Sequence, residues 1–113
     1  GIAVNRTSER IKGCRNGENF EFDIIAHNGT EIVIVEVKTT LRPADVTDFI
    51  ERLNKAKTYL PEYTDHRIIG CMAYLKDDGH AKNMAMKRGL LVIRATGNSA
   101  SIINAPEFDV KYY

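Results

Sequence analysis

Residues 20–40 read FEFDIIAHNGTEIVIVEVKTT, and this stretch decides the fold. Asn28 and Gly29 separate two runs of β-branched and aromatic residues. An Asn-Gly pair in this setting is typical of a tight hairpin, because both residues tolerate positive φ. The pattern therefore predicts two adjacent antiparallel strands, at residues 20–27 and 31–38.

The loop length leaves two registers open for this hairpin. A two-residue loop places Glu21 opposite Glu36, whereas a four-residue loop places Asp23 opposite Glu36 and Glu21 opposite Lys38. Alternate side chains of a strand share a face, so both registers gather the same charged residues on one side of the sheet. The other side is expected to be wholly apolar, with Phe20, Phe22, Ile24, Ala26, Val33, Val35 and Val37.

The charged face combines three carboxylates, Glu21, Asp23 and Glu36, with one ammonium, Lys38. Like charges that face each other destabilise a strand pair, and removing an ion from water costs roughly several kcal/mol. A divalent cation would offset the remaining charge, and carboxylate oxygens are ligands that Mg²⁺ prefers. The alternative is a solvated face whose acids point into water. The isoleucines between the acids favour a covered strand instead.

The whole chain has the length and composition of one small globular domain. It has 113 residues, of which 43% are hydrophobic and 27% charged. No apolar run approaches the about 18 residues that span a bilayer, so no membrane partner is expected. With a net charge of only +1, any nucleic-acid surface must come from local clustering.

The two cysteines, Cys14 and Cys71, have no second Cys or His nearby at metal-binding spacing. They are predicted to be free thiols in a reducing, cytoplasmic compartment. The chain begins at Gly1 rather than Met, and we expect it to be an excised fragment or to carry a tag remnant.

The chain is divided into a partly irregular leader at 1–19, the domain at 20–104 and a loosely ordered tail at 105–113. The leader holds the densest basic cluster, which is either a solvated arm or a phosphate-contacting one; its members are Arg6, Arg10, Lys12 and Arg15. Helical spacing of apolar residues after Pro43 predicts one amphipathic helix over 44–60, with Arg52 on its wet face. The later elements are expected as a strand at 67–76, a helix at 80–88 and strands at 90–95 and 100–104.

This order, with Asp on one strand and Glu-x-Lys on the next, resembles the restriction-endonuclease-like PD-(D/E)XK phosphodiesterase superfamily. More narrowly, residues 10–104 are similar to the C-terminal nuclease-like domain of a prokaryotic family with a helical or coiled-coil N-terminal region. The resemblance implies an α/β restriction-endonuclease-like core, a central mixed sheet of four to five strands flanked by helices. Two departures are Phe22 in place of the superfamily's Pro, and the absence of a predicted helix before Phe20. That N-terminal core helix, which carries a further Glu in many members, is expected to be missing, and Glu9 is the candidate replacement.

The resemblance further implies a metal-dependent nuclease that hydrolyses phosphodiester bonds of DNA. Asp23, Glu36 and Lys38 would be its catalytic residues. Asp23, Glu36 and the carbonyl of Val37 would hold one or two Mg²⁺ or Mn²⁺ ions, while Lys38 would orient or deprotonate the attacking water. The remaining site residues would be Glu21 and Thr40 around the ligands, and Arg10, Lys12 and Arg42 on the nucleic acid.

Two other functions stay open at this point. One is a catalytically inactive nuclease-like module that binds nucleic acid or mediates dimerisation, and the other is an RNA-directed nuclease. A homodimer is expected by analogy with such domains.

Overall fold

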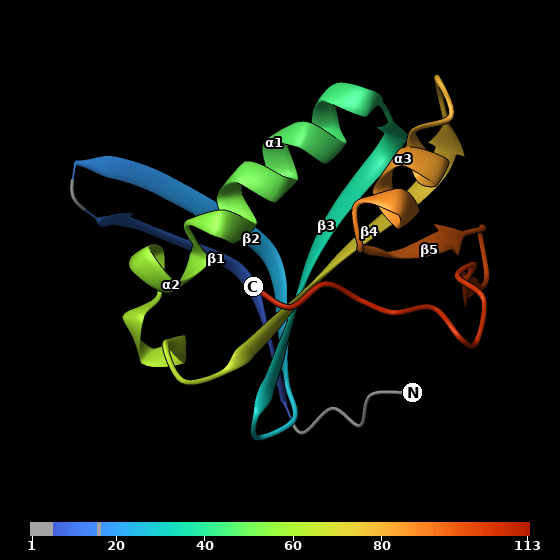
Figure 1. Ribbon diagram of the computed structural model, residues 1–113. Coiled ribbons are helices and arrows are strands. Elements are labelled where there is room, and N and C mark those ends of the chain that lie inside the picture. Colours follow the sequence, from blue (N-terminus) through green and yellow to red (C-terminus); the bar gives the residue numbers. More distant parts are fainter. Residues whose placement is uncertain (1–5, 16) are drawn as a thin grey trace.

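The computed structural model describes residues 6–15 and 17–113 and has the mixed α/β architecture that the sequence predicts (Figure 1). The described strands are β1 (Arg6–Arg15), β2 (Glu18–His27), β3 (Glu31–Leu41), β4 (Arg67–Asp77), β5 (Leu91–Ala95) and β6 (Ala100–Ile102). The helices are α1 (Pro43–Asn54), α2 (Ala56–Tyr59) and α3 (Ala81–Lys87), with a 3-10 turn at Pro61–Tyr63. One sheet contains all six described strands in sequence order, so the prediction of four to five strands was wrong.

The centre of the sheet is parallel and its edges are antiparallel. Strands β3, β4 and β5 run parallel to one another, and α1 and α3 form the connections between them. Strands β1, β2 and β6 pair antiparallel with their neighbours. Parallel neighbours need such crossover connections, so the order of helices and strands fixes this topology.

The helices cover one face of the sheet. The main core joins Val46, Phe49 and Leu53 of α1 and Ala81 of α3 to sheet residues such as Ile34. On the opposite face, the described residues form a small buried cluster, made of Ala26, Val33, Ile69 and Cys71. The helices expected to flank the sheet therefore lie on one of its faces in the described part of the chain.

Helix α1 begins where the sequence predicts. Pro43 is its first residue, and Asp45 accepts a hydrogen bond through Oδ2 from the Arg42 N–H at 2.8 Å. This contact satisfies an N–H group at the helix start and places a negative charge at the positive end of the helix. The predicted single helix over 44–60 ends at Asn54 instead, and α2 then positions Tyr59 to stack on Phe20 at 4.7 Å between ring centroids.

The β2–β3 hairpin adopts the register of the four-residue loop. His27 pairs with Ile32, and the ladder continues to Ile24 opposite Val35. Asn28 closes the loop, because its N–H donates to the Glu31 carbonyl at 3.1 Å and its Oδ1 accepts from the Glu31 N–H at 2.9 Å.

The predicted faces of β2 were wrong in its first half. Phe20 and Phe22 pack with Ile25 against the main core under the helices, whereas Ala26 lies on the opposite face. Strict alternation would place Phe22 and Ala26 on the same side, so the strand changes face between residues 22 and 25.

The change of face coincides with an interruption of the β1–β2 ladder. Pairs run from Arg6 opposite His27 to Arg15 opposite Glu18, but the pair of Arg10 and Asp23 is missing. Arg10 has a φ of 51°, in the left-handed region that residues other than Gly seldom adopt. The ladder of β1 and β2 is therefore interrupted at Asp23, with the same register on both sides.

Both ends of the described chain are more regular than predicted. Residues 6–15, expected in a partly irregular leader, form β1; the side chain of Glu9 lies outside the described part of the structure, as do those of Arg6 and Arg15. At the other end, Tyr113 exchanges backbone hydrogen bonds with Ile68 at 2.8 and 3.1 Å. The tail thereby fills the place beside the start of β4 that the shorter β5 leaves open.

Candidate active site

The candidate site forms where β2 and β3 separate. Their backbone ladder ends at Ile24 and Val35, so the next peptide groups of each strand lack a partner on the other. Side chains take over this role. The Val37 N–H donates to Asp23 Oδ2 at 2.9 Å, and Arg52 of α1 donates through Nη1 to the Glu21 carbonyl at 3.1 Å. Backbone N–H and C=O groups that leave a sheet ladder need other partners, and these charged side chains supply them.

The Asp23 and Glu36 carboxyl groups lie near each other at this point of separation. Glu36 is only 5% exposed, and its pKa is raised. Burial is the largest cause, because it disfavours the charged form; a hydrogen bond with Asp23 and the charge of Asp23 raise the pKa further. The hydrogen bond and charge of Arg52 oppose this shift. The structure therefore brings together the two carboxylates that the sequence singled out.

Glu36 is ion-paired with Arg52, a residue that sequence reasoning missed. Arg52 Nη2 donates to Glu36 Oε2, and the two side chains are 27% and 6% exposed. The Arg52 guanidinium also lies over the Phe49 ring, 5.5 Å from its centroid. Its predicted place on a wet helix face was wrong, because it is held by Glu36, the Glu21 carbonyl and Phe49.

Lys38 is directed along β3 towards the start of α1. Its Nζ lies 3.9 Å from Asp45 Oδ1, and its side chain is 37% exposed. Lys38 thus shares the helix-covered side of β3 with Glu36, but each pairs with a different residue of α1. Thr40, two residues further along, is partly buried on β3.

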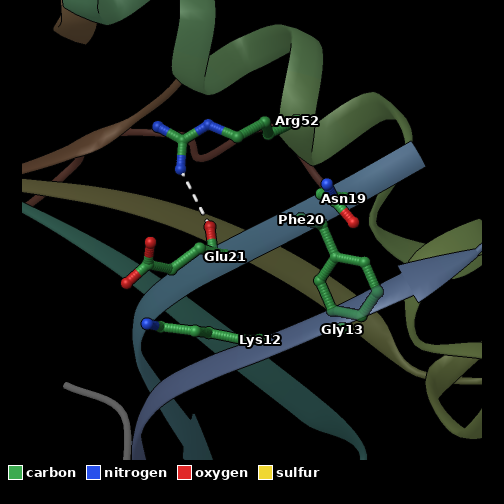
Figure 2. Close-up of a pocket in the computed structure, with 6 residues that line it drawn as sticks. All are labelled: Lys12, Gly13, Asn19, Phe20, Glu21 and Arg52. Atoms are coloured by element: carbon green, nitrogen blue, oxygen red, sulfur yellow. Dashed lines mark hydrogen bonds between the residues drawn. The ribbon is translucent and has the colours of Figure 1, made fainter.

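A hollow of about 580 Å³ opens beside Arg52, between α1 and the β1–β2 hairpin (Figure 2). Its lining residues are Lys12, Gly13, Asn19, Phe20, Glu21 and Arg52. Figure 2 shows the Lys12 ammonium and the Glu21 carboxylate extending to the same side, below the guanidinium that reaches the Glu21 backbone. Lys12 and Glu21 are also opposite each other in the ladder.

A second hollow, of about 480 Å³, contains Asp23. Arg10, Glu21, Asp23, Ile24 and Val37 line it. Glu21 therefore borders both hollows, and the two predicted nucleic-acid contacts on β1 are divided between them, Lys12 in the first and Arg10 in the second.

The third predicted nucleic-acid contact lies apart from these two. Arg42 follows the end of β3, and its Nε is 3.7 Å from Asp78 Oδ2, with a side chain that is 62% exposed. It lines neither hollow.

The donor set at the separation of β2 and β3 fits Mg²⁺ in its chemistry. Mg²⁺ usually keeps several waters and binds through one or two carboxylates, which Asp23 and Glu36 supply. Among residues 6–15 and 17–113, no group of three or more His, Cys, Asp or Glu side chains is arranged to hold a metal. The Val37 carbonyl is a candidate for a third protein ligand.

The raised pKa of Glu36 predicts a pH dependence of stability without metal. The ordinary pKa of a glutamate is 4.5, and that of folded Glu36 is higher. Between these two pH values, Glu36 is protonated more in the folded state than in the unfolded state. The free energy of unfolding contributed by Glu36 therefore falls as pH rises through this window. Urea denaturation of the wild type and of Glu36→Gln, in chelator and at a series of pH values from 4.5 upward, should show the wild type losing stability relative to the variant. If the difference in free energy of unfolding between the wild type and Glu36→Gln does not change with pH, the burial of this carboxyl is contradicted.

Three comparisons relate this chain to known proteins. Residues 5–102 match the model of a family described as "Domain of unknown function (DUF8196)". Among curated proteins, none matches the sequence. A crystal structure of AF1548, a protein of unknown function, is similar with a TM-score of 0.55 and 17% identity over 77% of this chain. The EndoMS–dsDNA2 complex is similar with a TM-score of 0.53 and 13% identity over 85% of this chain.

The likeness to these two structures concerns the fold. The chain spans 47% of the length of the AF1548 chain and 39% of the EndoMS chain.

In the part of the chain that the structure describes, no helix has the length and apolar character required to cross a membrane.

Proposed function

We propose that this chain, which belongs to the DUF8196 family, is a metal-dependent nuclease domain that hydrolyses phosphodiester bonds of DNA. The observation that carries the proposal is the meeting of the Asp23 and Glu36 carboxyls where β2 leaves β3. A break in a sheet is where side chains can converge from two strands without disturbing the ladder. EndoMS, which shares this fold, was determined in complex with double-stranded DNA, and this supports DNA as the substrate class.

Each residue of the proposed site has a separate task. Asp23 and Glu36 would hold one or two Mg²⁺ or Mn²⁺ ions, with the Val37 carbonyl as a further ligand. A bound divalent ion supplies Lewis-acid chemistry and a template for the phosphodiester. Lys38, on the same side of β3 as Glu36, would orient or deprotonate the attacking water once it leaves Asp45.

The basic residues near the site would hold the nucleic-acid backbone. Lys12 and Arg10 border the two hollows on either side of Glu21, so a phosphate chain that follows the hairpin would meet both. Glu21 and Thr40 would surround the ligands, and Arg42 would contact the strand beyond the end of β3. Phosphate contacts of this kind weaken with salt, so binding should fall as ionic strength rises.

The direct test is a cleavage assay with the purified protein. Labelled double-stranded DNA, single-stranded DNA and RNA of one sequence are each incubated with Mg²⁺, with Mn²⁺ or with a chelator. The proposal predicts metal-dependent cleavage that is faster on DNA than on RNA. Faster cleavage of RNA would replace DNA as the substrate class, and the absence of cleavage with either metal would contradict the catalytic proposal.

The ion pairs of α1 favour a second candidate function. Arg52 neutralises Glu36 and Asp45 pairs with Lys38, so both charges of the Glu-x-Lys pair have partners in the fold. This pairing is what a catalytically inactive nuclease-like module would need to balance the charges of Glu36 and Lys38 without a metal. Such a module would bind DNA with the same affinity in chelator and in Mg²⁺, whereas the nuclease should bind it more tightly with a non-cleaving divalent ion.

A further inference from the structure

We propose that Arg52 is a positioning residue that holds Glu36 in the metal-free protein and competes with a divalent ion for this carboxylate. The inference rests on the proposed function, because it concerns the same pair of acids. It adds a protein cation to the site and assigns it a role that the sequence pattern of Asp and Glu-x-Lys does not contain.

The first support is the enclosure of Glu36. Its side chain is 6% exposed, and the neighbours of its carboxyl are Arg52, which donates to Oε2, and Asp23. The guanidinium comes from the helix-covered side, whereas Asp23 comes from the strand that separates from β3. An incoming cation that bridges the two acids must therefore share Glu36 with the guanidinium or replace it.

The second support is the balance of charge. With Asp23 and Glu36 ionised, the two carboxylates and Arg52 carry one net negative charge. A divalent ion beside an unmoved guanidinium would reverse that sign in a partly buried place, where repulsion between like charges is stronger than in water. If Arg52 leaves, the ion and the two carboxylates are neutral together, which favours exchange over addition.

The third support is that Arg52 has space to move. It borders the hollow of Figure 2, next to Lys12 and Phe20, and its side chain is 27% exposed. The long side chain can turn into this space without unfolding α1. Its bond to the Glu21 carbonyl would be lost or rearranged in the process, and water in the open hollow can replace it.

A purely structural role for Arg52 makes a different prediction. If Arg52 only joins α1 to the separated strands, its removal lowers the free energy of unfolding and leaves metal affinity unchanged. If it only orients Glu36 for the metal, its removal weakens metal binding, as loss of an outer hydrogen bond does at other metal sites. Competition alone predicts tighter binding.

The experiment is a calorimetric titration of Mn²⁺ into the wild type, Arg52→Met and Arg52→Lys. Competition predicts about tenfold tighter binding by Arg52→Met, since such couplings are commonly five- to 150-fold. Arg52→Lys keeps the charge but cannot make the paired contacts to Glu36 and Glu21, so it should lie between the other two proteins. Thermal denaturation of each variant in chelator shows whether it folds. If Arg52→Met does not fold, Arg52→Lys provides the test.

Arg67→Met is the matched control. Arg67 of β4 is ion-paired with Glu31 of β3, and its Nη2 is 3.1 Å from Glu31 Oε2. Glu31 lies five residues before Glu36 on β3, so the control removes an equal charge from an ion pair outside the candidate site. It should bind Mn²⁺ like the wild type. Equal tightening in the control would mean a general charge effect and would overturn the proposal for Arg52.

The outcomes separate the two proposals. If the wild type binds Mn²⁺ and both Arg52 variants bind it equally tightly or more weakly, the competition proposal is overturned and the nuclease proposal is left intact. Absence of Mn²⁺ binding in the wild type and in every variant would contradict the metal site itself, and with it both proposals.

Discussion

Glu36→Gln is expected to lower Mg²⁺-dependent cleavage of DNA by about a thousandfold or more. The substitution keeps the size of the side chain and its ability to accept from Arg52, but it removes the charge that would hold the metal. Because Glu36 is buried beside Asp23, water cannot supply an equivalent anionic ligand at this position. Initial rates of cleavage of a labelled duplex, for the wild type and the variant at equal concentration, measure the effect.

The matched control for this prediction is Glu31→Gln. Glu31 begins the same strand and is also ion-paired with an arginine, Arg67, but it lies at the opposite end of β3 from the separated strands. Its cleavage rate should stay within a few-fold of the wild type. A Glu36→Gln variant that is folded and cleaves as fast as Glu31→Gln would contradict the assignment of Glu36.

Phe49→Ala is expected to lower the free energy of unfolding by about 3–5 kcal/mol. Phe49 is 0% exposed at the centre of the face that α1 packs on the sheet. Its loss removes a large buried apolar surface and leaves a cavity beneath the helix. It also removes the ring under the Arg52 guanidinium, so the ion pair with Glu36 should be less well held. Urea denaturation followed by circular dichroism gives the difference.

Asp48→Ala is the control on the same helix. Asp48 is exposed one residue before Phe49, so its substitution should change stability by no more than about 0.5 kcal/mol. A loss in Phe49→Ala as small as that in Asp48→Ala would contradict the packing of α1.

The central hairpin and the start of α1 could be predicted from the sequence because local rules determine them. Asn28 and Gly29 set the turn, with a φ of 93° at Gly29, and Pro43 with Asp45 sets the helix start. The sequence left two registers open for the hairpin, and the observed ladder has the one that directs Asp23 towards Glu36. These features depend on residues close together in the chain.

The change of face in β2 could not be predicted by alternation. It coincides with the left-handed backbone of Arg10, a residue on another strand, and with the separation of β2 from β3. Both faces of the sheet carry apolar residues, so the hydrophobicity of Phe20 and Phe22 alone cannot assign them to one face. The face that the helices cover could not be predicted for a related reason, since the central strands are apolar on both faces.

Arg52 had a signal that was overlooked. On β3, Glu36 precedes Lys38, and on α1, Asp45 precedes Arg52 by seven residues, which is about two helical turns and returns to the same side. Because α1 runs back along β3, Asp45 of the helix pairs with Lys38 of the strand, and Arg52 of the helix pairs with Glu36 of the strand. Complementary charges in this reversed order on consecutive strand and helix indicate contact across the layers.

Both the proposed nuclease activity and the proposed role of Arg52 require Asp23 and Glu36 to hold one divalent ion between them. A crystal structure of the protein soaked with Mn²⁺, with anomalous data, measures this directly. We expect an anomalous peak about 2.0–2.2 Å from oxygens of both carboxylates, with the Arg52 guanidinium moved off Glu36 into the hollow beside Lys12. A site without an anomalous peak, in which Arg52 still donates to Glu36 at saturating Mn²⁺, would contradict the account.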